Sequence, residues 1–133
     1  LFYIWQVQID GIDTRDFLRP SFLYADILGL FSEFLLAGVI APVGEELLFR
    51  GFLFASLRTK MGSWLAALIS SLIFAVLHYY SIIGMCSILL FGLCMCWMYT
   101  KTRTLWPCII LHAIMNIQIT FSGWYLFATS PQS

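Results

Sequence analysis

The sequence predicts an all-α protein, a polytopic transmembrane helical bundle of about four core spans whose first helix is long and kinked. Three observations predict this fold. Hydrophobic residues make up 61% of the 133 residues and charged residues only 11%, whereas a soluble domain carries about 25% charged residues. The apolar residues form runs that are long enough to cross a bilayer as helices. Most basic residues fall at the ends of these runs, where spans meet the membrane surface.

We expect one domain, with an intramembrane core at residues 26–127. Residues 1–25 are expected to be an interfacial or loop segment, or the end of a preceding span, and residues 128–133 a tail. Three aspartates and a glycine in residues 10–16 lack the spacing and the closing glutamate of an EF-hand, so a solvated loop is expected there. The chain begins at Leu1 without a signal-peptide pattern, which suggests a fragment or a processed chain.

The partners expected from composition are the lipid bilayer and no nucleic acid, because the formal net charge is zero and no basic patch is present. The expected location is an integral, multi-pass membrane position, in the cell membrane if the source is prokaryotic. The sequence does not set the oligomeric state.

The first predicted helix covers residues 26–57, which are apolar apart from Glu33 and a charged group at Glu45, Glu46 and Arg50. At about 1.5 Å per residue this segment is longer than the ~30 Å hydrocarbon core. It is either one long tilted helix or two pieces hinged at residues 42–44. Because proline removes an N–H and disrupts the preceding turn, a kink is expected just before the two glutamates.

Three shorter spans follow, after basic residues and a turn at Gly62. They are expected at residues 64–80, 82–99 and 105–121. Gly84 and Gly92 permit close helix contact in the second of these, and a proline is tolerated in the first turn of the last one. Trp124 and Tyr125 resemble interfacial anchors. The four cysteines lie in apolar runs, and we expect free thiols that pack as small hydrophobes.

Polar side chains inside apolar helices are the informative feature, because a charge at the bilayer centre costs roughly 2.5–3.5 kcal/mol on insertion scales. Glu46 and Arg50 are four residues apart, with the acid first, which favours an ion pair within one helix. Glu45 points about 100° away from Glu46 and therefore faces other neighbours.

The remaining polar residues also fall at helical spacing. His78 follows Phe74 by four residues, and Asn116 follows His112 by four. Two glutamates, two histidines and one asparagine that converge in a water-filled cavity could activate a water and stabilise an oxyanion, with or without a metal. Taken singly, the same residues fit a buried structural ion pair, an interfacial histidine and a polar contact between helices.

Other patterns of intramembrane hydrolases are absent from the sequence. It contains no His-Glu-x-x-His, no Gly-x-Ser-x-Gly and no aspartate within a span after Asp26. These absences argue against the site-2-type zinc, serine and aspartyl classes.

Taken together, the polar pairs resemble the three motifs of the CAAX protease and bacteriocin-processing family (CPBP, or Abi) of intramembrane proteases, which includes the type II CAAX prenyl endopeptidases. The match follows the family's order and helical placement over residues 26–121. The motifs are Glu45-Glu46-x-x-x-Arg50, Phe74-x-x-x-His78 and His112-x-x-x-Asn116.

The resemblance implies an endopeptidase whose site lies in a membrane cavity. Glu45 would activate the attacking water with the help of His78, while His112 and Asn116 would hold the oxyanion. Glu46 is the fifth expected catalytic residue and would shape the site.

Arg50 and Phe74 would support this site structurally. Zinc or another divalent metal, if used, would be held by carboxylate and imidazole groups, and a metal-free glutamate mechanism is the alternative. The expected metal ligands are Glu45, Glu46, His78 and His112. The substrate would be a peptide or a membrane protein. Its identity does not follow, because some family members are linked to bacteriocin self-immunity. Family members usually have more spans upstream, so a truncated chain is expected.

Orientation follows from the basic span ends at residues 58–60 and 101–103. They flank two spans and are expected on the same side, which the positive-inside rule makes cytoplasmic. Helical rise from these ends places Glu45, His78 and His112 at depths of roughly 20, 27 and 13 Å. His78 then matches the others only if its helix is tilted or the cavity is deep.

Two other functions remain open from the sequence. The glutamates and histidines could form the proton or cation site of a transporter or ion-binding bundle, or His78 and His112 could bind a haem as a membrane anchor. A haem protein would show a Soret band, and a transporter would not cut a peptide.

Overall fold

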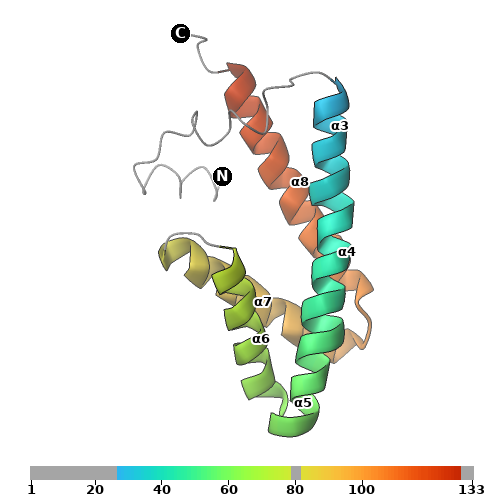
Figure 1. The fold of residues 1–133 in the computed structure, drawn as a ribbon, viewed down its shortest axis with the longest axis vertical. Coiled ribbons are helices and arrows are strands. Elements are labelled where there is room, and N and C mark those ends of the chain that lie inside the picture. Colours follow the sequence, from blue (N-terminus) through green and yellow to red (C-terminus); the bar gives the residue numbers. More distant parts are fainter. Residues whose placement is uncertain (1–26, 79–81, 130–133) are drawn as a thin grey trace. The chain divides into compact units, whose positions relative to one another are not determined.

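All secondary structure within the described residues, 27–78 and 82–129 of the computed structural model, is helical (Figure 1). The prediction of an all-α protein is therefore confirmed. The N-terminal segment 1–25, with its aspartate-containing loop, and residues 130–133 of the expected tail lie outside the described residues. The elements are α3 (Ile27–Leu35), the π-helical segment η1 (Leu36–Ile40), α4 (Ala41–Glu46), the π-helical segment η2 (Leu47–Phe54), α5 (Ala55–Met61), α6 (Ser63–Leu77), α7 (Ile82–Thr102) and α8 (Trp106–Thr129).

The chain divides into two compact units. One comprises Leu1–Ala41 with His112–Ser133, and the other comprises Pro42–Leu111. Helical conformation is continuous from Ile27 to Met61, in agreement with a long first helix. The boundary between the units falls between Ala41 and Pro42, where the hinge is expected. The kink itself stays a prediction.

In the first unit, η1 approaches α8 closely at Gly38. A Cβ added to Gly38 would lie 2.8 Å from Cγ1 of Ile117, so only glycine permits this contact without a shift of the isoleucine. One residue away, the side-chain amide of Asn116 donates a hydrogen bond to the carbonyl oxygen of Ala37 at 2.9 Å. A steric contact and a polar contact therefore join these two helices.

In the second unit, the helical run from α4 to α5 buries a residue at every fourth position: Pro42, Glu46, Arg50 and Phe54. In a regular α-helix positions four apart drift by about 40° around the axis. The π-helical segment η2 has wider turns, with i→i+5 hydrogen bonds, and it offsets this drift. The buried side chains consequently stay on one face of the helix.

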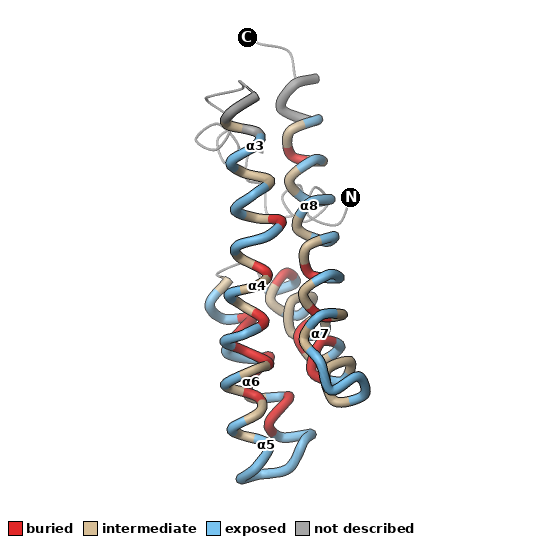
Figure 2. The backbone as a smooth tube through the Cα atoms, turned by 90° about the vertical axis from the view of Figure 1, so that its right-hand side faces the viewer, coloured by how far each residue is buried: buried red, intermediate tan, exposed pale blue. Residues whose placement is uncertain are grey.

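This face packs against α6 and α7, which run alongside each other (Figure 1). Phe54, Ala66, Ala67 and Cys96 form a buried cluster, and buried positions recur along these helices in Figure 2. A Cβ added to Gly92 would lie 2.8 Å from Cβ of Ser71. The predicted role of Gly92 in close helix contact is confirmed.

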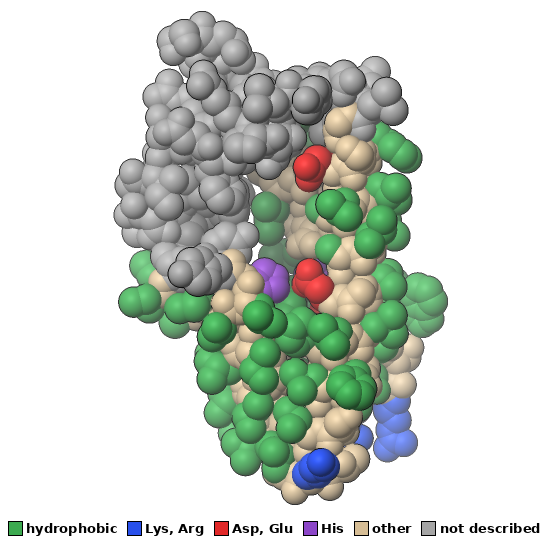
Figure 3. All heavy atoms as spheres, viewed as in Figure 1, with side chains coloured by type: hydrophobic (Ala, Val, Ile, Leu, Met, Phe, Trp, Pro, Cys, Tyr) green, Lys and Arg blue, Asp and Glu red, His purple; other side chains and the backbone are tan. Residues whose placement is uncertain are grey.

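Two turns lie at the end of the second unit that carries Arg58, Lys60, Lys101 and Arg103, which we call the basic end. Gly62 has a φ of +82°, as expected for the glycine of a turn, and Arg103 has a φ of +56° after the end of α7. Lys and Arg side chains gather near this end in Figure 3. Because α5 and α7 both end here, their basic residues lie at one end of this unit, and their common side of a membrane stays a prediction.

Many large apolar side chains are exposed on the described helices, whereas Glu46 and Arg50 are fully buried. Among the described residues one helix, α7, is long and apolar enough to cross a membrane, and α6 is a shorter apolar helix of 15 residues. A bundle of four spans therefore stays a prediction. The predicted span limits need adjustment, because α6 ends at Leu77 rather than at residue 80, while α7 and α8 extend beyond residues 99 and 121.

The cysteines differ from the expectation of uniform burial. Cys96 and Cys108 are buried, but Cys86 and Cys94 are exposed. Cys94 and Cys96 lie on different faces of α7, as their spacing predicts, and no disulfide joins the four thiols.

Candidate active site

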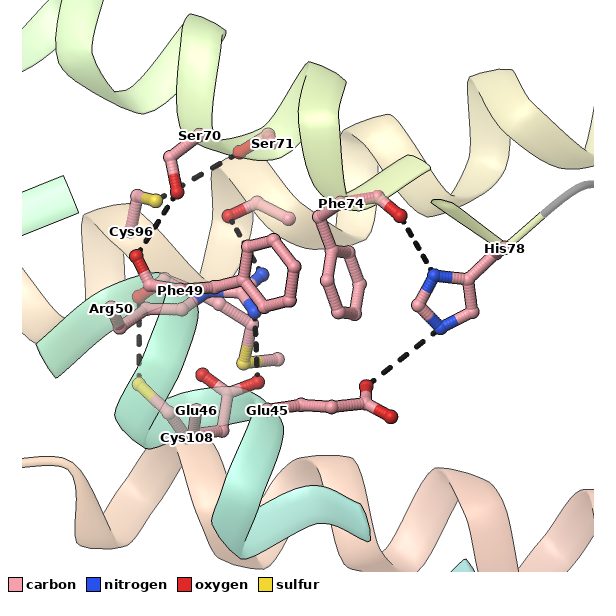
Figure 4. A network of polar contacts seen from close by, with 12 residues as sticks. Glu45, Glu46, Phe49, Arg50, Ser70, Ser71, Phe74, His78, Cys96 and Cys108 are labelled. Atoms are coloured by element: carbon pink, nitrogen blue, oxygen red, sulfur yellow. Dashed lines mark hydrogen bonds and ion pairs between the residues drawn. The ribbon is translucent and has the colours of Figure 1, made fainter. Parts of the chain in front are cut away.

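The predicted ion pair between Glu46 and Arg50 is present and buried (Figure 4). Nη1 of Arg50 lies 3.0 Å from Oε1 of Glu46, and both side chains are at most 1% exposed. Nη2 of Arg50 lies 3.4 Å from the carbonyl oxygen of Gly92 and donates to it. The guanidinium carbon lies 4.5 Å from the centre of the Phe74 ring, a distance suited to a cation–π contact. Arg50 therefore links α4, α6 and α7.

Phe74 occupies the centre of this network. Its ring makes an edge contact with Phe49, with 4.8 Å between ring centres, and lies 4.4 Å from the His78 ring centre. Ser70 donates a hydrogen bond to the carbonyl oxygen of Phe49 at 3.0 Å, which ties α6 to η2. The expected supporting role of Phe74 thus has a physical basis: one ring contacts the arginine and the histidine.

Glu45 faces away from this pair and toward His78, as the angle between adjacent residues predicts. Oε2 of Glu45 lies 3.7 Å from Nε2 of His78, and the two side chains are 31% and 29% exposed. Both side chains are partly exposed beside the buried pair, although Oε2 of Glu45 itself is buried (Figure 4). An acidic and a histidine side chain also lie together amid apolar atoms in Figure 3.

The other nitrogen of His78 fixes the ring. Nδ1 lies 2.7 Å from the carbonyl oxygen of Phe74. A carbonyl can only accept a hydrogen bond, so Nδ1 carries the proton of this contact. In the neutral imidazole, Nε2 is then an acceptor and faces Glu45.

The His78 side chain lies beside that of Glu45, although residue counting places it deeper in the membrane. That counting begins at the basic residues before Gly62, but α6 begins only at Ser63. The residues of the turn add no helical rise to the second helix. The 15 residue steps from Ser63 to His78 give about 22 Å of helical rise, and the 15 steps from Lys60 back to Glu45 give the same at this rise.

His112 and Asn116 belong to the other unit. Both lie in α8 at the predicted spacing of one turn. The hydrogen bond of Asn116 to Ala37 agrees with a polar contact between helices, and the amide has a second N–H to offer. Their convergence with Glu45 and their role toward an oxyanion stay predictions.

Comparison with known proteins places this site in a family. Residues 27–118 match the family described as type II CAAX prenyl endopeptidase Rce1-like. The chain belongs to this Rce1-like family. All seven motif residues of the sequence lie within the matched range. Members are membrane proteases, so the chain is a membrane protein.

Two curated relatives agree with membership of the Rce1-like family. The chain is 32% identical over 96 residues to the "UPF0177 protein YxdF" of Lactococcus lactis subsp. lactis (strain IL1403), with 70% of this chain and 52% of the relative covered. It is 31% identical over 85 residues to the "Putative membrane peptidase YdiL" of Bacillus subtilis (strain 168), with 62% of this chain and 33% of the relative covered. The chain thus spans about half the length of one relative and a third of the other. No solved structure matches.

The metal ligands expected from the resemblance are divided between the two units of the Rce1-like chain: Glu45, Glu46 and His78 lie in one and His112 in the other. Within the described residues, no group of three or more His, Cys, Asp or Glu side chains is arranged to hold a metal ion. Glu46 is engaged by Arg50, which leaves Glu45 and His78, whereas catalytic zinc sites use three protein ligands. Dependence on zinc or another divalent metal stays a prediction.

Two parts of the network had no signal in the motifs. The Gly92 carbonyl that accepts from Arg50 and the Phe49 carbonyl that accepts from Ser70 are backbone groups, and any residue carries such a group. The signal that could have indicated them is the small size of Gly92 and Ser70 at positions where two helices meet.

Proposed function

We propose that the protein is an intramembrane endopeptidase of the CAAX type in which Glu45 and His78 activate the attacking water. The observation that supports this most strongly is the 3.7 Å separation of the Glu45 carboxylate and the His78 imidazole, both partly exposed. At this separation a direct hydrogen bond is too long, and a water that contacts both groups is favoured.

The two groups suit a single water. With Nδ1 protonated against Phe74, Nε2 of His78 accepts one hydrogen of the water and the Glu45 carboxylate accepts the other. The lone pairs of the water oxygen then point away from both residues and toward a peptide carbonyl. As the oxygen bonds to the carbonyl carbon, Glu45 takes the proton and later delivers it to the leaving amine nitrogen.

Arg50 pairs with only one of the two adjacent glutamates, and this difference supports different roles for them. Arg50 forms a buried ion pair with Glu46, so Glu46 serves to hold Arg50 in place. The Glu45 side chain is partly exposed and faces His78 instead. We therefore propose a glutamate-type mechanism, with His112 and Asn116 as oxyanion donors contributed by α8.

The proposed setting is a bundle of about four spans, of which α7 meets the criteria of a membrane span. The rival functions receive less support. A haem bound at Nε2 of His78 would occupy the space beside Glu45, and the matched family consists of endopeptidases rather than transporters.

Peptide cleavage in reconstituted bilayers tests the proposal. The panel contains a prenylated CAAX peptide, the same peptide without the prenyl group and an apolar transmembrane peptide. We expect cleavage of at least one peptide by the wild type and none by Glu45→Gln. A Soret band, or ion transport without cleavage by the wild type, would contradict it.

A further inference from the structure

The basic end of the second unit is formed by four exposed residues, Arg58, Lys60, Lys101 and Arg103. They are four of the seven Lys and Arg residues of the chain. The sequence after Glu46 contains no aspartate or glutamate. Among the described residues no carboxylate forms an ion pair with any of the four. This end therefore carries positive charge that its own unit does not neutralise.

Three exposed tryptophans accompany these charges. Trp64 lies in the first turn of α6, Trp106 begins α8, and Trp97 precedes Lys101 by one turn of α7. Their exposed fractions are 74%, 68% and 62%. Tryptophan prefers the boundary between hydrocarbon and headgroups. Exposed tryptophan beside exposed Lys and Arg indicates that this end lies in the headgroup layer.

Arg103 adds a separate observation, because its backbone is in the left-handed region, with φ +56°. Its N–H donates a hydrogen bond to the carbonyl oxygen of Tyr99 at 2.8 Å. Glycine is the usual residue at a helix C-terminus that makes this hydrogen bond. Glycine occupies the equivalent position after α5, as Gly62. This conformation is disfavoured for residues with a side chain, so the chain carries an arginine where glycine would fold more easily.

We propose that the basic end binds the headgroups of anionic phospholipids in the leaflet that surrounds it. Four cations without carboxylate partners match the phosphate charge, and the tryptophans hold this end at headgroup depth. The favourable interaction of basic residues with helix C-termini applies to the last turns of α5 and α7. It does not explain an arginine placed after the end of α7 in a conformation that favours glycine.

Quenching of tryptophan fluorescence by brominated lipids tests this proposal. The full chain is reconstituted in phosphatidylcholine bilayers that contain dibrominated phosphatidylglycerol or dibrominated phosphatidylcholine. We expect stronger quenching by the anionic lipid at low salt and a smaller difference at high salt, because salt screens exposed charges. Removing one basic residue is expected to lower the preference by up to about fivefold.

Arg103→Gly separates lipid binding from folding. Glycine relieves the backbone strain, so the melting temperature is expected to stay the same or rise, while the preference for the anionic lipid falls. Arg103→Lys should keep the preference. Arg15→Gln is the matched control, because it removes the same charge from the segment before α3.

Equal quenching by the two lipids at low salt would overturn the proposal. An unchanged preference in both Arg103→Gly and the Lys60→Gln/Lys101→Gln variant would also overturn it. If Arg15→Gln lowered the preference for the anionic lipid as much as Arg103→Gly does, the effect would be one of net charge. That result would also reject a binding surface at the basic end. None of these measurements depends on peptide cleavage, so the proposal stands or falls separately from the proposed protease activity.

Discussion

Glu45 and Glu46 are adjacent in the sequence but have different neighbours. Glu46 is buried against Arg50, whereas Glu45 is partly exposed and faces His78. One step of about 100° around the helix produces this difference. Substitutions of the two glutamates are consequently expected to act in different ways, one on chemistry and the other on stability.

Glu45→Gln is expected to lower the rate of peptide cleavage by about 10²–10⁴, the usual loss when a general base is removed. Glutamine keeps the size of the side chain, so the melting temperature in detergent should equal that of the wild type. The measurement is cleavage of a substrate found in the peptide panel. Glu33→Gln, in α3, is the control for the loss of one carboxylate, and retained activity in a folded Glu45→Gln protein would assign the base to another group.

Arg50→Ala is expected to destabilise the protein by about 3–5 kcal/mol, because it leaves a buried carboxylate without its ion-pair partner. Thermal unfolding in detergent measures this loss. The double variant Glu46→Gln/Arg50→Met, which removes both charges, should recover part of it. A single Arg50→Ala variant as stable as the wild type would show that the pair is exposed in the folded protein.

For single residues, the sequence predicted the contacts that are made by side chains. The i,i+4 spacing predicted the Glu46–Arg50 pair, and the angle between adjacent residues predicted a separate direction for Glu45. The acceptors of Arg50 and Ser70 on Gly92 and Phe49 are carbonyl groups. No residue type marks a carbonyl acceptor, so spacing alone does not reveal it.

Helix contact in the second unit depends on the absence of a side chain at Gly92. A Cβ there would lie 2.8 Å from Cβ and 2.9 Å from Oγ of Ser71. The same residue presents its carbonyl to Arg50. A shift of α7 away from α6 would therefore also lengthen a contact of the buried ion pair.

Gly92→Ala is expected to destabilise the protein by about 1–3 kcal/mol through overpacking. Gly44→Ala is the matched control: it lies in α4 with no atom near the added Cβ, and alanine favours a helix over glycine. Thermal unfolding of the two variants in one detergent makes the comparison. Equal melting temperatures would indicate that α6 and α7 separate at no cost.

Helix positions were largely predictable from apolar runs, but the π-helical segments were not. A run of leucine and phenylalanine fits α and π turns equally well. The wider turn of η2, which accompanies the burial of Pro42, Glu46, Arg50 and Phe54 on one face, therefore leaves no mark in the sequence. Residue counting also did not anticipate the contact between His78 and Glu45. Residue counting assumed continuous helical rise through the turn at Gly62.

For the whole molecule, the common end of α5 and α7 gives a prediction of topology. In a cysteine-free background, Lys60→Cys and Lys101→Cys are expected to react with an impermeant maleimide from the same side of sealed vesicles. Ile82→Cys, at the other end of α7, should react from the opposite side, because α7 is long enough to span. Labelling of the two lysine positions from opposite sides would contradict this arrangement.

The ion pair within one helix also has a consequence for biosynthesis. Glu46 and Arg50 bond across a single turn, so the contact needs only the helix that contains it. That helix is synthesised before α6 and α7. The nascent segment can therefore present the translocon with two charges already neutralised, when each alone would oppose insertion by roughly 2.5–3.5 kcal/mol. The arginine that later holds three helices together first makes its own helix easier to insert.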